Sequence, residues 1–155
     1  MNKILICYFS ATGKTKVVAH NIAKAIGGDL FEIVPSIKYT ENDLDWEDKT
    51  SRSSIEMDNI NSRPKILNKV ENIDNYNTIL IGYPIWWYTA PRIINTFIEE
   101  NNLKNKKIYL FATSGGSGIE KSLSDLKDTY KDLNFISTKR FSGNEDANTY
   151  LNWLK

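Results

Sequence analysis

The chain has 155 residues, of which 41% are hydrophobic and 25% charged, and its formal net charge is +1. This length suits a single domain, residues 1–155, with a substantial core. The near-neutral charge offers no basic surface for nucleic acid and no acidic tail. The single cysteine excludes an internal disulfide and favours a reducing compartment. The apolar run 4–9 is too short for a signal peptide or a membrane span, so we expect a cytoplasmic protein with no membrane partner.

Strand-like and helix-like segments alternate along the chain. Continuous apolar runs rich in β-formers predict strands buried on both faces, at 3–9, 30–34, 78–83, 107–113 and 135–141. Helical spacing of apolar residues predicts helices at 15–26, 64–76, 89–100, 117–130 and 144–154. Gly27-Gly28 ends the first helix, Thr89 is expected to cap the third, and residues 117–120 match a capping box.

Five strand–helix units in succession predict a parallel sheet with helices on both faces. Ligands of such sheets bind beyond the carboxyl ends of the strands. The loops after the first, third and fourth strands are therefore the candidate functional segments, at residues 10–15, 83–91 and 113–118.

The first loop reads Ser-Ala-Thr-Gly-Lys-Thr over residues 10–15. Its Gly-Lys-Thr also ends the P-loop of nucleoside triphosphatases, but Tyr8 stands where a P-loop needs its first glycine. Three hydroxyls, a lysine and the start of a helix favour a terminal monophosphate instead. An ordinary capped helix start explains the same residues, because Ser and Thr are common there. The loop alone leaves both interpretations open.

The second loop carries three consecutive aromatic residues, Trp86-Trp87-Tyr88, directly after a buried strand. These side chains could belong to the hydrophobic core. Large aromatics at a strand end become exposed, however, which favours a stacking surface for a flat ligand. We expect Trp86 or Trp87 to stack, with Pro84 and Ile85 contributing backbone near the ligand.

The third loop places three glycines among hydroxyl residues, over 113–118. Glycine lets the backbone approach a ligand closely. A flexible strand-to-helix turn with a cap is the alternative, and both hold if Ser117 caps the helix while residues 114–116 contact the ligand.

Together these motifs resemble the flavodoxin family, and the resemblance covers the whole chain. Residues 10–15 are similar to the family's Ser/Thr-x-Thr-Gly-x-Thr phosphate loop, and residues 83–88 and 113–118 match its aromatic and glycine-rich loops. The last helix follows the fifth strand directly, which resembles the short-chain type, and the Trp-Trp loop and the long segment after strand two resemble a bacterial flavodoxin-like branch of the family. The resemblance implies a flavodoxin-like, doubly wound α/β fold with five parallel strands in the order 2-1-3-4-5 and FMN at the switch between strands one and three.

The resemblance also implies which residues bind FMN. They are Ser10, Thr12, Gly13, Lys14 and Thr15 at the phosphate, Pro84, Ile85, Trp86, Trp87 and Tyr88 at the ring, and Thr113, Ser114, Gly115, Gly116 and Gly118 at the pyrimidine end. No catalytic residue and no metal is implied, because the flavin supplies the electron chemistry.

Three functions follow from this resemblance. The leading one is a carrier of low-potential electrons between a reductase and an acceptor protein. The second is an FMN-dependent NAD(P)H:quinone-type reductase, favoured by two departures from the flavodoxin pattern: the near-neutral charge, and the lack of a glycine between Tyr83 and Glu100, where many flavodoxins flip a peptide. The absence of a recognisable second nucleotide pocket in the sequence argues against it. The third is a binding module that has lost its flavin.

The long segment 35–63 has weak periodicity and is expected to be irregular. Loops of this length are uncommon in compact domains and are often functional. It contains a single tryptophan, Trp46, among the acidic residues Glu41, Asp43, Asp45, Glu47 and Asp48. It could dock a partner, cover the flavin, or form a solvated excursion anchored only by Trp46. The cover is the favoured interpretation, because strand two should leave the segment on the ligand side of the sheet.

Other sites fit the sequence poorly. Cys7 lies within a strand and is expected in the core, since Gly13 stands where a Cys-x5-Arg phosphatase loop needs arginine. His20 shares the polar face of the first helix with lysines and is expected to face solvent. One histidine and one cysteine make a metal site unfavourable. Residues 9–11 lack the acidic residues of a receiver domain of the same topology.

Overall fold

A computed structural model describes residues 3–114 and 118–155 of the chain. Five parallel strands form one sheet in the order β2-β1-β3-β4-β5, which confirms the predicted topology. The strands are β1 (Ile4–Tyr8), β2 (Asp29–Glu32), β3 (Thr78–Pro84), β4 (Lys107–Thr113) and β5 (Asn134–Arg140). Each overlaps an expected strand, and β1, β3 and β4 are mainly buried, as expected. The expectation of burial on both faces is wrong for β2 and β5, which are mostly exposed because they form the two edges of the sheet.

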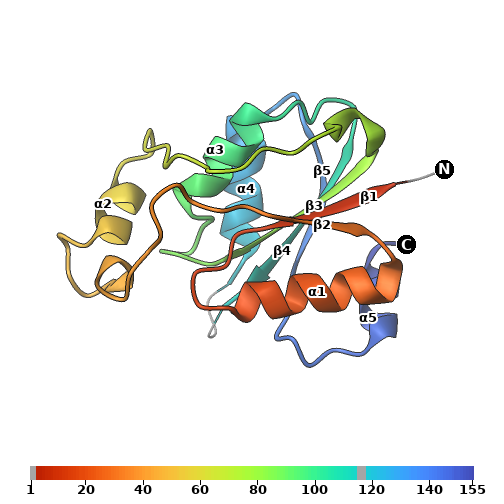
Figure 1. Cartoon of the computed structure of the whole chain (residues 1–155), viewed down its shortest axis with the longest axis horizontal. Helices are drawn as coiled ribbons and strands as arrows, with labels where there is room; N and C mark the ends of the chain where they lie inside the picture. The colour runs from red at the N-terminus through yellow and green to blue at the C-terminus, as the bar shows by residue number, and fades with distance from the viewer. Residues whose placement is uncertain (1–2, 115–117) are drawn as a thin grey trace.

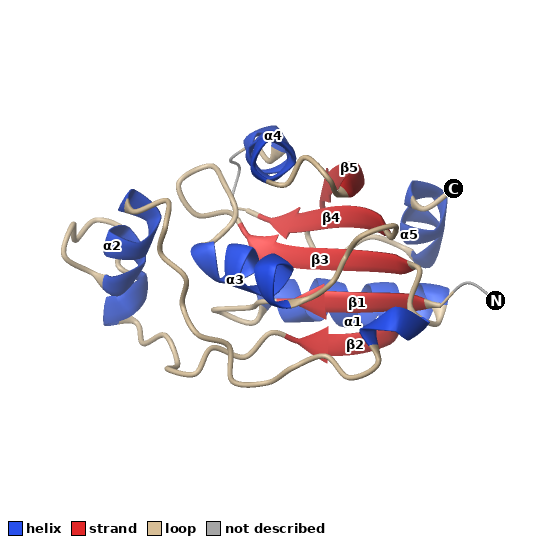
Figure 2. Cartoon of the chain, turned by 90° about the horizontal axis from the view of Figure 1, so that it is seen from above, coloured by secondary structure: helices blue, strands red, loops and turns tan. Residues whose placement is uncertain are grey.

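The helices cover both faces of the sheet, as predicted (Figure 1). The α-helices are α1 (Lys14–Ile26), α2 (Arg52–Asp58), α3 (Arg92–Glu100), α4 (Glu120–Thr129) and α5 (Ala147–Trp153), with short 3-10 turns at Asn42–Leu44 and Ile73–Asn75. Figure 2 shows α1 and α5 on one side of the sheet and α3 and α4 on the other. Helix α2 stands apart, beyond the carboxyl ends of the strands.

Alternation along β1 divides the core into two layers. Leu5 and Cys7 pack in the layer that contains α3, and Ile6 and Tyr8 pack in the layer that contains α1. Cys7 has no exposed surface, so its predicted core position is confirmed, and burial raises the pKa of its thiol. His20 is exposed, as predicted.

The helix expected over residues 64–76 is wrong. Ile66 forms an antiparallel bridge with Pro35, and the Asn68 side chain accepts a hydrogen bond from the Val34 N–H at 3.2 Å. The segment therefore satisfies its backbone by running in extended form along the edge of the sheet. Apolar residues at helical spacing misled the prediction, because tertiary pairing overrides periodicity in a short segment.

The segment 35–63 is less irregular than expected, because it contains α2. Trp46 does not anchor it: the side chain is 70% exposed. The buried side chains that do anchor it include Tyr39 and Met57. Tyr39, before α2, and Met57, within it, therefore help to fix a segment whose sequence shows little periodicity.

The predicted cap of the third helix differs from the structure. Helix α3 begins at Arg92 with Pro91 as its N-cap, so Thr89 is not the cap. The Thr89 hydroxyl instead donates to Asp125 on α4 at 2.7 Å. The expected capping box includes Ser117, which lies outside the described residues.

Among the described residues, no helix is long and apolar enough to cross a membrane. These residues also contain no group of three or more His, Cys, Asp or Glu side chains that could hold a metal ion.

We predict that Gly82→Ala destabilises the fold. Gly82 lies in the central strand β3, and a Cβ there would stand 2.1 Å from the ring of Phe111, which is itself completely buried. Neither β3 nor the ring can move freely, so the free energy of unfolding should fall by about 2 kcal/mol or more, measured by urea denaturation. The matched control is Gly118→Ala, where the nearest atom is the end of the exposed Glu120 side chain. Equal stability of the two variants would contradict the prediction.

Candidate functional site

The three predicted loops meet at the carboxyl edge of the sheet. Strand β3 lies between β1 and β4, so the loops that follow these strands are neighbours. The Phe9 N–H donates to the Gly82 carbonyl at 3.0 Å, and the Ile85 N–H donates to the Thr113 carbonyl at 3.0 Å. These backbone hydrogen bonds hold the loops against one another. Figure 2 shows that β1, β3 and β4 end at the same edge of the sheet.

The first loop turns sharply into α1. Gly13 has φ 97°, a left-handed conformation that favours glycine. The Ser10 hydroxyl accepts from the N–H groups of Gly13 and Lys16, both at 3.1 Å, and so closes the loop. Thr12 and Lys14 are exposed at the turn. The first turn of a helix leaves N–H groups without intrahelical acceptors, so this end of α1 favours an anion.

Thr15 and Thr113 are brought together by the fold. Their hydroxyls share a hydrogen bond of 2.8 Å, and both residues are buried. The bond joins the start of α1 to the end of β4. Both residues were predicted to contact a ligand, and in this structure their hydroxyls contact each other, which fixes the distance between the first and third loops.

The second loop is a tight turn closed by two backbone hydrogen bonds between Trp86 and Thr89, at 2.9 and 3.0 Å. Trp87 and Tyr88 between them have φ 48° and 67°. Positive φ at both central residues is the signature of a type I′ turn, which normally holds Asn and Gly. Two bulky side chains in this conformation are strained, at about 1–3 kcal/mol each.

The aromatic residues of this turn divide into one packed and two exposed side chains. The Trp86 ring makes edge contacts with Phe9 and Tyr39, with ring centroids 5.6 and 5.4 Å apart. Trp87 and Tyr88 are 42% and 64% exposed. The core interpretation therefore fits Trp86, whereas the other two are available to a ligand.

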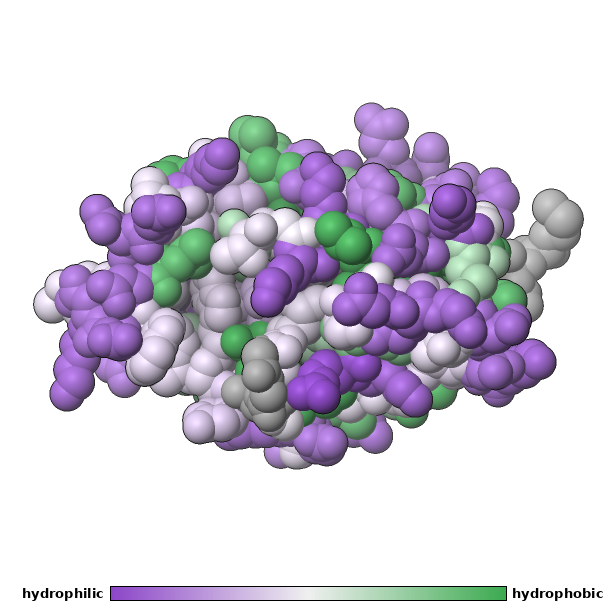
Figure 3. Space-filling view, turned by 90° about the horizontal axis from the view of Figure 1, so that it is seen from below, coloured by the Kyte–Doolittle hydropathy of each residue, from purple (hydrophilic) through white to green (hydrophobic). Residues whose placement is uncertain are grey.

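A cavity of about 500 Å³ lies against the turn. It is lined by Leu44, Trp46, Ser53, Ile85, Trp86, Trp87 and Tyr88. Three of these residues, Leu44, Trp46 and Ser53, belong to the segment 35–63. They were not among the predicted ligand contacts, although the sequence favoured this segment as a cover over the ligand. Trp46, the single tryptophan of the segment, was the sequence signal that could have found them. In Figure 3, pale side chains of intermediate hydropathy line a recessed area toward the α2 end of the molecule.

The third loop is only partly described. Ser114 is half-buried at the end of β4, and Gly118 is exposed before α4. Gly115 and Gly116, which were predicted to contact the ligand, lie outside the described residues. Pro84 is the last residue of β3, beside Thr113 in register.

Arginine side chains hold the segment 35–63 in place. Arg52 lies over the Tyr39 ring at 3.7 Å and pairs with Glu56 at 2.8 Å. The Tyr39 hydroxyl donates to the same carboxylate. Burial, together with the negative charge of Glu56, raises the pKa of Tyr39, so the phenol remains a donor at neutral pH.

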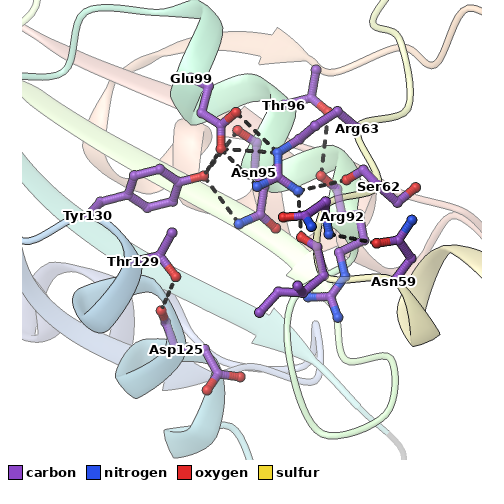
Figure 4. Close-up of polar contacts among 12 residues, drawn as sticks. Asn59, Ser62, Arg63, Arg92, Asn95, Thr96, Glu99, Asp125, Thr129 and Tyr130 are labelled. Carbon is purple, nitrogen blue, oxygen red and sulfur yellow. Dashed lines mark hydrogen bonds and ion pairs between the residues drawn. The ribbon is translucent and has the colours of Figure 1, made fainter.

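Two more arginines fasten the return of the segment to α3 (Figure 4). Arg92 donates to the carbonyl of Met57, the penultimate residue of α2, at 2.7 Å. Arg63 pairs with Glu99 at 3.0 Å, and the Tyr130 hydroxyl donates to that carboxylate. Burial by itself would raise the pKa of Glu99, but the interactions with Arg63 and Tyr130 outweigh it, so the pKa is lowered. The segment is therefore fixed to the sheet layers at several points.

Comparison with known proteins agrees with this fold. A model of the flavodoxin family matches residues 3–155, so the chain belongs to the flavodoxin family. The chain is also similar to a crystallised flavoprotein candidate from Bacteroides eggerthii, at 51% identity and a TM-score of 0.96, over 99% of this chain and 96% of the other. A similar candidate from Bacteroides uniformis has 44% identity and a TM-score of 0.93, over 99% and 97%.

A more distant relative carries a cofactor. The flavoprotein from Lactobacillus acidophilus, crystallised in complex with FMN, is 28% identical, with a TM-score of 0.79 and complete coverage of both chains. FMN, the cofactor expected from the sequence, is thus the ligand of a relative that matches over the full length. A search of curated proteins found no match to this chain.

We predict that the double variant Trp87→Asn/Tyr88→Gly is more stable than the natural protein. Asn and Gly suit the left-handed positions of the turn, and the two aromatic side chains that are lost lie outside both core clusters. Thermal and urea unfolding should show a gain of about 1 kcal/mol. Trp46→Asn, which removes an exposed aromatic without left-handed backbone at that residue, is the control and should give no gain. A loss of stability in the double variant would show that the turn carries no net strain.

Proposed function

We propose that this protein binds FMN and carries low-potential electrons between a reductase and an acceptor protein. The observation that carries the proposal is the meeting of an anion-binding helix start and an exposed aromatic turn at one edge of the sheet. The buried Thr15–Thr113 hydrogen bond holds the loops that flank this edge together. A phosphate at one end and a flat ring at the other is the chemical pattern of FMN.

The residues present fit this cofactor. The Thr12 and Lys14 side chains and the N–H groups of the first turn of α1 would hold the phosphate, and Ser10 would shape the loop. The exposed Trp87 and Tyr88 would cover a face of the ring, since Trp86 is packed against the core. Bound FMN would supply the capacity to accept and release electrons.

The protein's own residues would then orient the cofactor and exclude water. The type I′ turn already has two left-handed residues and is closed by two hydrogen bonds. The Thr89 hydroxyl anchors its last residue to Asp125. A turn fixed in this way should change conformation less between redox states than a turn that contains a glycine. The electron affinity of the site would therefore be set mainly by side-chain packing that stays the same in both states.

A second candidate function is an FMN-dependent NAD(P)H:quinone-type reductase. It is favoured by a second hollow beside Trp87, described below, which gives room for a small-molecule acceptor. For the electron carrier, by contrast, we propose that both partners, the reductase and the acceptor, are redox proteins.

The first experiment is a visible spectrum of the purified protein followed by titration with FMN. Flavin absorption bands, or saturable quenching of FMN fluorescence, would support the proposal. A colourless protein that fails to bind added FMN would overturn both candidates. The loaded protein is then mixed with NADH or NADPH: rapid oxidation without another protein would favour the reductase, and none would favour the carrier.

We predict that Lys14→Ala weakens FMN binding in a salt-dependent way. The exposed Lys14 ammonium lies at the loop proposed to hold the phosphate dianion, so its loss should raise the Kd about fivefold at low ionic strength and by less at high salt. The control is Lys24→Ala, the same change in the last turn of α1 and far from the loop. Unchanged affinity at low salt, or an equal effect of both variants, would place the Lys14 side chain away from the phosphate.

A further inference from the structure

A second hollow also borders the exposed indoles. Its volume is about 1030 Å³, and it lies between the α2 region and the Trp turn. Trp46 and Trp87 line both this hollow and the smaller cavity described above. Ile55 and Met57 of α2 complete its apolar wall, and Lys49 and Asn59 provide hydrogen-bond donors at its rim.

The two shared tryptophans are unusually exposed. Trp46 is 70% and Trp87 42% exposed, and within the described part of the chain neither has a ring contact. Trp86 and Trp153, by contrast, each pack against other aromatic rings. Exposed apolar groups that line a concave surface usually mark a binding site.

The hollow is formed in advance of any ligand. Arg52 fixes the start of α2 through the Ile37 carbonyl at 2.6 Å, and Arg92 fixes its end through the Met57 carbonyl. The strained turn holds Trp87 out of the core on the opposite wall. Walls that are fixed from both sides reduce the entropy lost when a ligand binds.

We propose that this groove binds a planar, largely apolar small molecule with carbonyl or hydroxyl groups at its edges, of the quinone class. The two indoles and Ile55 would contact the faces of such a molecule, and the Lys49 and Asn59 side chains would reach its edge oxygens. Binding at this groove stands independently of FMN. Its role as the site of an electron acceptor rests on the second candidate function, the FMN-dependent reductase.

The walls favour a small molecule over a protein partner. The apolar side chains line a recess, and the rim mixes Lys49 with acidic groups such as Asp58, so it carries no dominant charge to attract a macromolecule. A cavity of this size also exceeds what a flat bicyclic ring needs, which leaves room for a substituent.

The test uses menadione, a naphthoquinone, with the full-length protein both free of FMN and saturated with it. Isothermal titration gives the Kd, and the indole N–H signals in a nitrogen–proton spectrum report the place of binding. We expect saturable binding that shifts the Trp46 and Trp87 signals, while the Trp153 signal, whose N–H donates to Ser137, stays unchanged.

Ile55→Glu is the decisive variant, because Ile55 is 58% exposed and lines the second hollow but not the first. It should weaken menadione binding by about tenfold or more and leave FMN binding unchanged. Ile37→Glu is the matched control: that side chain is 70% exposed and lines neither hollow, so its affinity should equal that of the natural protein.

Three results would overturn the proposed binding site. They are no saturable binding of menadione, an equal loss of menadione affinity in both variants, or displacement of menadione by FMN, which would place the probe at the cofactor site. Failure of the proposed function is a separate observation. A protein that does not bind FMN, but whose menadione binding is weakened by Ile55→Glu and not by Ile37→Glu, would support the groove and contradict the flavin proposal.

Discussion

Burial of both faces of the central strands is the constraint on which this site depends. Strand β1 sends alternate side chains into two separate core layers, so neither face of the central sheet is open to a polar ligand. Polar and exposed groups therefore gather where the strands end and the chain turns outward. The Thr15–Thr113 hydrogen bond, formed between two buried hydroxyls, then determines how far apart the loops around this edge can lie. An unsatisfied hydroxyl in either position would be costly, which makes the pair a strong constraint on loop geometry.

The segment 35–63 illustrates how polar contacts replace a core where few apolar residues are present. Arg52, Arg63 and Arg92 join it to itself and to α3 through carboxylates and backbone carbonyls. Each guanidinium has several donors in a planar group, so one side chain can satisfy more than one acceptor. These contacts place Trp46 beside the Trp turn while leaving the indole exposed. The same fixed segment forms walls of the cavity beside the Trp turn and of the second hollow, so the two proposed sites share their rigidity.

The Trp turn combines strain with exposure, two features that each reduce stability. Trp87 and Tyr88 occupy left-handed backbone positions and remain open to solvent, whereas the neighbouring Trp86 packs against Phe9 and Tyr39. The packed ring and the hydrogen bonds of the turn hold the strained residues in place. Conformational strain retained at a surface loop is typical of ligand sites, where a fixed geometry lowers the cost of binding.

The sequence by itself determined the strand–helix alternation, the sheet order through the family resemblance, the core position of Cys7 and the three loops of the candidate site. These features depend on local periodicity, on turn residues and on motifs within a few residues. The prediction from sequence failed at residues 64–76, where pairing with Pro35 along the sheet edge outweighed helical spacing. It also failed at Thr89, whose hydroxyl donates to Asp125 instead of capping a helix. Only the tertiary structure decided which tryptophan is packed, brought Thr15 to Thr113, and placed Trp46 beside Trp87. Such contacts join residues far apart in the chain, and no local pattern of residues encodes the distance between them.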